Sequence, residues 1–162
     1  MSKQSLKSGV AAVMAVLLFG FAQVESVTAQ PPPKDPDRYI PGLGDLMEGL
    51  QVQHNKLWFA GEQLNWPLAA YSVDALKEVI ADMMVLRPRY KGESIVAMLD
   101  GLTAEPLLAL KEAVAAQDSA GFVRAYDALT DGCNVCHRNH GYGFIAIVRP
   151  SVPVLINQRY EP

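Results

Sequence analysis

Cys133 and Cys136 are the only cysteines of the 162-residue chain, and His137 follows them directly. Two thiols at this spacing can close a disulfide, form a redox pair of the thioredoxin kind, or contribute to a zinc site. The redox pair belongs in a βαβ setting, and the surrounding residues show no strand alternation. Zinc needs four ligands, and the two cysteines with the nearby His140 leave that set short.

The same residues spell Cys-x-x-Cys-His, which is the attachment signature of a c-type haem. Two thiols about one helical turn apart can reach the two vinyl groups of the porphyrin. The imidazole that follows can project under the porphyrin and ligate the iron. We therefore predict one haem c, bound covalently through Cys133 and Cys136, with His137 as the proximal iron ligand.

Residues 1–29 have the composition of a signal peptide that is cleaved from the mature protein. Lys3 and Lys7 precede an almost unbroken apolar run over residues 10–22, and residues 27–29 fit a signal-peptidase site. An uncleaved membrane anchor is the alternative interpretation. Cleavage would leave a periplasmic protein, in the compartment where haem attachment usually occurs. No later apolar run reaches the ~18 residues that a membrane span requires.

Composition and charge exclude several other classes of protein. The chain has a net charge of −3 and a pI near 5.6, so it lacks the basic surface that nucleic-acid binding requires. Its length suffices for one core but not for a second, cofactor-binding domain. The sequence shows no paired carboxylates, no nucleophile beside a histidine and no phosphate-binding loop. We therefore do not expect an enzyme.

Before the haem motif, the apolar residues repeat at helical spacing. Residues 30–41 are predicted to form an extended, proline-rich lead-in. A first helix is predicted from Gly42 to about Gly61. A second helix begins after Asn65, a good N-cap that Trp-Pro follows, and ends near Pro88.

The second half of the chain is predicted to add two more helices. Residues 89–101 look looser, with at most a short helical turn at 95–99. Thr103 is the predicted N-cap of a third helix, with Pro106 in its first turn. A fourth helix, capped at residues 118–119, carries the haem motif along one side.

Four amphipathic helices with short connections predict an all-α fold, an antiparallel up-down four-helix bundle over residues 42–140. Residues 141–162 are predicted to form an extended C-terminal tail, because a lone strand would have no partner. The first and fourth helices would lie antiparallel, so the start of the first meets the end of the fourth, where the haem is attached. Gly132 is costly within a helix, and a close approach of the haem would explain it.

Beyond the haem motif, three stretches of the chain resemble known proteins: His54 through Trp58 to Gly61, Asn65 to Tyr71, and Gly141 to Ile145. A Cys-x-x-Cys-His on the last helix of a four-helix bundle resembles the class II c-type cytochromes, the cytochrome c-prime group. The three stretches resemble a set of small exported monohaem proteins of proteobacteria. The resemblance implies a periplasmic haem protein that transfers electrons or binds small gases, and it does not choose between these functions.

Two residues of the first helix are candidates for the distal iron ligand. Met47 and His54 share one helical stripe but lie about 10 Å apart along the axis, so only one can lie near the iron. Met47 is the predicted ligand because it lies nearer the helix start, and the run 45–50 resembles the helix that supplies methionine in low-spin bundle cytochromes. His54 is the alternative ligand, or a buried histidine beside Trp58 or Tyr126. An open distal site is the third interpretation, and Met47 would then be a core residue.

Three further residues are predicted around the haem. Tyr126 is expected to line the haem pocket, and Arg138 and Arg149 are expected to bind the propionates, because guanidinium pairs well with carboxylates. Ordinary packing and solvated surface charge are the alternatives. His140 lies on the same segment as the proximal ligand, so we expect it at the surface or behind that ligand.

The predicted function is that of a periplasmic electron carrier with an unidentified redox partner protein. Two axial ligands keep haem iron low-spin, and methionine opposite histidine raises the reduction potential. One alternative is a gas-binding or sensing protein of the cytochrome c-prime kind, in which an open distal site takes nitric oxide or carbon monoxide. Another is a haem subunit of a larger redox complex, which the extended tail would suit unless it wraps the protein's own haem edge. A homodimer through helix faces is left open.

Overall fold

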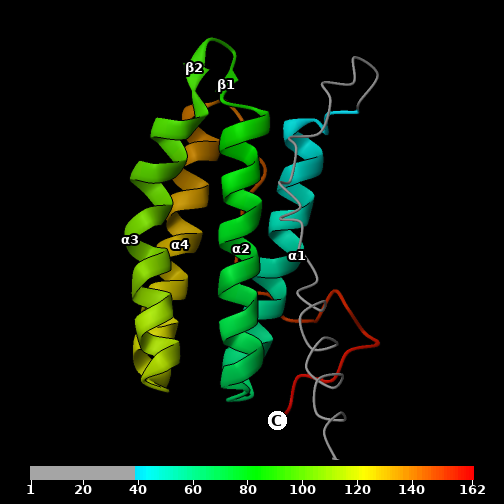
Figure 1. Cartoon of the computed structure of the whole chain (residues 1–162), viewed down its shortest axis with the longest axis vertical. Coiled ribbons are helices and arrows are strands. Elements are labelled where there is room, and N and C mark those ends of the chain that lie inside the picture. Colours follow the sequence, from blue (N-terminus) through cyan, green and yellow to red (C-terminus); the bar gives the residue numbers. More distant parts are fainter. Residues whose placement is uncertain (1–38) are drawn as a thin grey trace, which may run out of the picture. The chain divides into compact units, whose positions relative to one another are not determined.

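The computed structural model describes residues 39–162, so the predicted signal peptide and residues 30–38 of the lead-in lie outside the described residues. Within them the chain forms four helices: α1 (Leu43–Glu62), α2 (Trp66–Leu86), α3 (Ile95–Ala115) and α4 (Ser119–Asn139). Successive helices run in opposite directions, each packs against the next, and α1 also contacts α4 (Figure 1). The predicted antiparallel up-down four-helix bundle is confirmed.

Both ends of α2 and the start of α4 lie close to where the sequence predicts them. The Asn65 side chain accepts a hydrogen bond from the Leu68 N–H at 3.2 Å, so the predicted N-cap of α2 is confirmed. α2 ends at Leu86, shortly before Pro88, because proline disfavours helical backbone at the residue that precedes it. Asp118 occupies the N-cap position of α4, within the predicted pair of residues.

The start of α3 was predicted wrongly. The helix begins at Ile95, and Ser94 caps it by accepting a hydrogen bond from the Ala97 N–H at 3.3 Å. Thr103 is therefore not an N-cap. It is buried within the helix, where its hydroxyl donates to the Leu99 carbonyl at 2.7 Å. This local bond satisfies the hydroxyl inside the helix, as threonine can do in place of capping.

Pro106 lies inside α3 rather than in its first turn. A proline has no N–H to donate, so the carbonyl of Leu102 loses its helical partner. The same carbonyl lies against α4 at Gly132, where an added Cβ would stand only 2.6 Å from the oxygen. In this structure the close approach at Gly132 is that of the α3 backbone, a cause that the sequence interpretation did not consider.

A small hairpin that the sequence did not predict joins α2 to α3. β1 (Arg89–Tyr90) pairs antiparallel with β2 (Glu93–Ser94). The turn residues Lys91 and Gly92 have φ of 48° and 89°, as a two-residue type I′ turn requires. The hairpin stands at the end of the bundle where α1 begins and α4 ends (Figure 1).

The apolar stripes of α1 and α4 have two different environments. In the half away from the hairpin they are packed and buried, and Gly61 of α1 lies directly on the ring of Phe122. In the half beside the hairpin the same stripes are only partly buried. The buried members are Leu57, Ala60, Phe122, Tyr126 and Leu129, and the partly buried members are Leu43, Met47, Leu50, Cys133 and His137.

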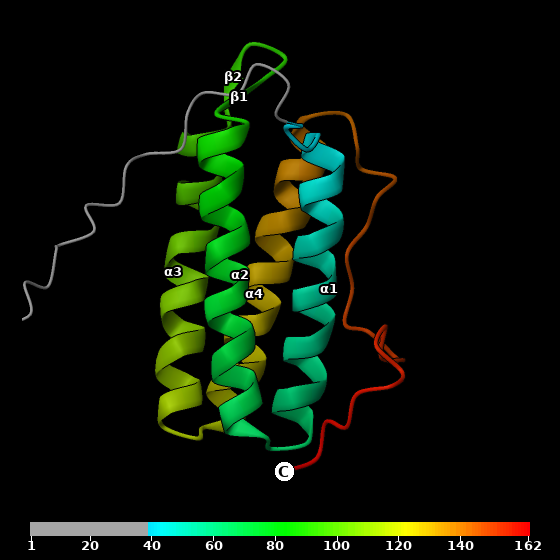
Figure 2. The same cartoon turned by 45° about the vertical axis from the view of Figure 1, so that its right-hand side comes forward.

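The C-terminal tail, residues 141–162, contains turns and bends but no helix or strand, as predicted. It runs from the end of α4 along the outer side of α1 toward the opposite end of the bundle (Figure 2). Near its end the buried Tyr160 packs on Phe59 of α1, with 5.6 Å between the ring centroids. None of the helices in residues 39–162 is both long and apolar enough to cross a membrane.

Candidate functional site

A cavity of about 510 Å³ lies between α1, α3 and α4 at the hairpin end of the bundle. The partly buried halves of the helix stripes face it, which explains why they are not packed against one another. Most of its lining is apolar. The lining side chains include Leu43, Met47, Leu50 and His54 of α1, Ile95, Met98, Leu99 and Leu102 of α3, Cys133, Cys136 and His137 of α4, and Ile145 and Ile147 of the tail.

Both thiols of the predicted haem motif line this cavity and are not joined to each other. Burial raises the pKa of the Cys133 thiol to about 11, because the apolar surroundings disfavour the thiolate. Burial also raises the pKa of Cys136. Reactive redox pairs of the thioredoxin type depend on a lowered thiol pKa, so the environment of these cysteines does not suit that chemistry.

The imidazole of His137 is oriented by the tail. Its Nδ1 lies 2.7 Å from the carbonyl oxygen of Ile145, and a carbonyl can only accept, so Nδ1 carries the proton. In the neutral ring the lone pair is then on Nε2. A histidine that ligates a metal through one nitrogen commonly donates its other N–H to a carbonyl or carboxylate in this way. The arrangement is compatible with a metal-ligating imidazole.

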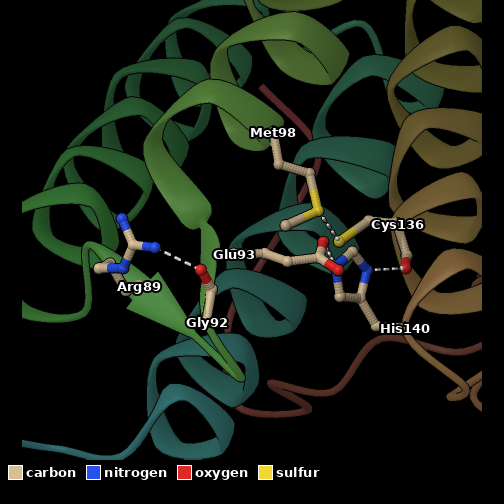
Figure 3. Close-up of polar contacts among 6 residues, drawn as sticks. All are labelled: Arg89, Gly92, Glu93, Met98, Cys136 and His140. Carbon is tan, nitrogen blue, oxygen red and sulfur yellow. Dashed lines mark hydrogen bonds and ion pairs between the residues drawn. The ribbon is translucent and has the colours of Figure 1, made fainter.

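Met47 lines the α1 side of the cavity, where the antiparallel pairing of α1 and α4 was predicted to bring it. A second methionine, Met98 of α3, also lines the cavity and was not considered from the sequence. The Cys136 thiol donates to the Met98 sulfur at 3.4 Å (Figure 3). The sequence predicted residues 89–101 to be mostly non-helical, so Met98 was not placed on a helix face.

His54 is part of a buried hydrogen-bond network between α1 and α4. Thr130 donates to the Tyr126 carbonyl at 2.9 Å, so its oxygen accepts from His54 Nε2 at 2.9 Å. Burial lowers the pKa of His54 to about 4, and the ring is therefore neutral near pH 7. With the proton on Nε2, Nδ1 of the neutral ring accepts from the Tyr126 hydroxyl at 2.9 Å, and the same hydroxyl lies 3.2 Å from the His54 carbonyl. Both ring nitrogens are occupied, and the ring also stacks on Tyr126 at 4.3 Å between centroids.

His140 joins the end of α4 to the hairpin. Its Nδ1 donates to the Cys136 carbonyl at 2.9 Å, and its Nε2 donates to the Glu93 carboxylate at 2.9 Å (Figure 3). When the ring is protonated, both nitrogens can donate at once, and these two hydrogen bonds raise the pKa of His140. His140 also borders the cavity, beside Cys136 and His137.

The remaining predicted pocket residues lie in other places. Tyr126 is buried below the cavity, where it bonds to His54. Arg149 makes a two-pronged ion pair with Asp127 and stacks over the Trp58 ring at 5.0 Å. Arg138 is exposed near the end of α4.

The polar side of the cavity mouth comes from the hairpin and the start of the tail. The hydroxyls of Tyr90 and Tyr142 are hydrogen-bonded to each other, and both side chains line the cavity. The Lys91 ammonium lies 4.8 Å from the centre of the Tyr142 ring. Hydrogen bonds from Tyr90 and Lys91 lower the pKa of Tyr142. Tyr142 lines the cavity and Lys91 lies beside it, so both offer donors at this end of the cavity.

In residues 39–162 no three histidine, cysteine or carboxylate side chains converge as a metal site of their own. Comparison with family models, with curated proteins and with solved structures found no match.

Proposed function

We propose that the chain binds one haem c covalently through Cys133 and Cys136 and acts as a periplasmic electron carrier. The observation that carries the proposal is the juxtaposition of both motif thiols with His137 at one cavity. The Nε2 of His137 keeps its lone pair because Ile145 holds the opposite nitrogen. These are the two attachment groups and the proximal ligand that a c-type haem needs.

The size of the cavity also fits a bound group. Its 510 Å³ falls within the range of roughly 300–1,000 Å³ typical of small-molecule and cofactor sites. Its lining is mostly apolar, so a bound group of matching chemistry would remove that apolar surface from water.

When bound, the haem would supply the one-electron chemistry of its iron. The chain's own residues would anchor it through the two thiols, ligate it through His137, and exclude water with the apolar lining. Tyr142 at the cavity and Lys91 beside it would supply donors for the propionate carboxylates. Electron transfer needs no acid or base beyond this set, which agrees with the proposal that the protein is not an enzyme.

Met47 is the sixth ligand that we favour. It lies on the α1 side of the cavity, near the start of a helix that runs antiparallel to α4. Met98 of α3 is the competing methionine, because its contact with the Cys136 thiol would be lost once that thiol became a thioether. His54 would have to give up hydrogen bonds to Tyr126 and Thr130 before it could bind iron. A thioether opposite His137 would favour ferrous iron and a high reduction potential.

Gas binding is the second candidate function, and a specific observation favours it. Leu43 and Leu50 flank Met47 on the same face of α1, and all three line the cavity. If Met47 were displaced, these side chains would leave an apolar site for nitric oxide or carbon monoxide opposite His137. The distal ligand therefore decides between the two functions.

The first test is intact mass and visible spectroscopy of the purified mature protein, in ferric and ferrous states, before and after carbon monoxide. The proposal expects one haem that survives denaturation, a low-spin spectrum and no response to carbon monoxide. A mass without haem contradicts the haem proposal. A high-spin spectrum that shifts with carbon monoxide replaces electron transfer with gas binding.

Met47→Leu and Met98→Leu form a matched pair for the distal ligand. Leucine keeps the volume of methionine but cannot ligate iron. Met47→Leu is expected to remove the methionine-to-iron charge-transfer band of the ferric protein, and Met98→Leu is expected to keep it. A spectrum that Met47→Leu leaves unchanged excludes Met47 as the ligand.

A further inference from the structure

Asparagine side chains of the bundle hydrogen-bond to the backbone of the C-terminal tail, as a neighbouring β-strand would. Asn134 of α4 donates to the Ile147 carbonyl and accepts from the Ile147 N–H, each at 2.8 Å. Asn55 of α1 donates to the Val152 carbonyl at 3.1 Å and accepts from the Val154 N–H at 2.9 Å. An extended chain has unpaired backbone groups, and these amides satisfy them at two separate points.

The tail segment from Tyr142 to Ile147 is held by hydrogen bonds at both ends. At its start, the Tyr142 N–H donates to the His137 carbonyl at 2.7 Å, and the Ile145 N–H donates to the Tyr142 carbonyl at 2.8 Å. At its end, Ile147 is held by Asn134. The Ile145 carbonyl lies between these points and accepts from His137 Nδ1 at 2.7 Å. Its position is therefore fixed by the turn and by Asn134 together.

We propose that the tail is the positioning element of the iron ligand, and that Asn134 sets the position of the Ile145 carbonyl on His137. This inference rests on the proposed haem function. Asn134 lies inside the Cys-x-x-Cys-His motif but points to the tail instead of the cavity, so one short segment carries both the ligand and its support.

The consequence is pre-organisation of His137. The carbonyl selects the ring form with the proton on Nδ1, which leaves Nε2 ready for the iron. Ile145 and Ile147 also line the cavity, so the same docking closes its α4 side with apolar groups. If Asn134 released the tail, His137 would lose its partner and the cavity would lose part of its wall.

The test compares Asn134→Ala with Asn139→Ala in the full mature protein. Asn139 is the last residue of the same helix and is exposed, so its variant controls for loss of an α4 amide. Nuclear magnetic resonance would follow the solvent exchange of two protons, the Ile147 amide and the His137 Nδ1 proton. Asn134→Ala is expected to accelerate both by about tenfold or more, and Asn139→Ala neither.

Acceleration at Ile147 with unchanged exchange at His137 Nδ1 would overturn the proposal, because the tail would then be docked by Asn134 without positioning the ligand. Unchanged exchange at both protons would also overturn it. Asn134→Asp keeps the acceptor for the Ile147 N–H and is expected to give a smaller acceleration. It supplies the same comparison if the alanine variant fails to fold.

Failure of the haem proposal is distinguishable from failure of this one. The former appears as a protein mass without haem, and both protons can then still be followed in the haem-free chain. Where haem is present, the Fe–His137 stretching frequency of the ferrous form, measured in a Met47→Leu background that removes the proposed sixth ligand, gives an independent readout. Loss of the Nδ1 hydrogen bond is expected to lower it in Asn134→Ala, and a purely structural role of Asn134 would leave it unchanged.

Discussion

His54→Gln tests the assignment of His54 as a buried neutral histidine instead of an iron ligand. In the folded protein burial lowers the pKa of His54 to about 4, whereas in the unfolded chain it returns to the ordinary 6.5. The unfolded state therefore binds more protons as the pH falls below 6.5, and the free energy of unfolding decreases until about pH 4. Glutamine can keep the bonds to Tyr126 and Thr130 but does not titrate in this range.

The size of the effect follows from the two pKa values. Linkage between 6.5 and about 4 gives a loss of about 2 kcal/mol from pH 7 to pH 5, and about 3 kcal/mol by pH 4. Other groups add their own slopes, and the raised pKa of His140 acts in the opposite sense, since its stabilisation grows as the pH falls. Both proteins contain these groups, so the difference between wild type and His54→Gln isolates His54.

The assay is guanidinium unfolding followed by far-ultraviolet circular dichroism at pH 7 and pH 5. The wild type is expected to lose about 2 kcal/mol more than His54→Gln over this interval. Equal losses in the two proteins would refute the buried neutral assignment. If His54 ligated the iron instead, His54→Gln would also change the low-spin spectrum, which the buried assignment does not predict.

Two more predictions follow from the packing and the tail. Gly132→Ala places a Cβ 2.6 Å from the Leu102 oxygen, so thermal unfolding should show that the free energy of unfolding falls by about 1–2 kcal/mol despite the better helix propensity of alanine. Gly101→Ala has open space around the new Cβ, so its free energy of unfolding should rise by up to about 1 kcal/mol. Equal effects of the two would contradict the close approach. Asn55→Ala removes both amide bonds to the tail, so limited proteolysis should cleave the tail faster than in Asn157→Ala; identical digestion would show that Asn55 does not hold it.

The sequence predicted those parts of the fold that depend on local chemistry. Asn65 was predicted as an N-cap because asparagine favours that position and the Trp-Pro that follows fits the first turn of a helix. In the structure the Asn65 side chain accepts a hydrogen bond from the Leu68 N–H. Thr103 was misread because a threonine three residues before a proline resembles a helix start. The actual start at Ile95 is instead capped by Ser94 after a hairpin whose two-residue strands are too short to give an alternating pattern.

The residues of the candidate site were likewise only partly predictable from the sequence. Cys133, Cys136 and His137 were predicted as haem-binding residues from their spacing, and the structure brings all three to one cavity. Met98 and the carbonyl of Ile145 were missed, because their positions depend on contacts between segments far apart in sequence or on backbone atoms that carry no sequence signal.

The sequence by itself determined the helix periodicity, most of the helix ends and the presence of a Cys-x-x-Cys-His motif, since each depends on residues within a turn or two of one another. Only the tertiary structure decided that the stripes of α1, α3 and α4 enclose a cavity at one end, that His54 is tied to Tyr126 and Thr130, and that the tail returns to hold His137. A helical stripe specifies which face is apolar. Whether that face meets another helix or borders a cavity depends on how the neighbouring helices pack.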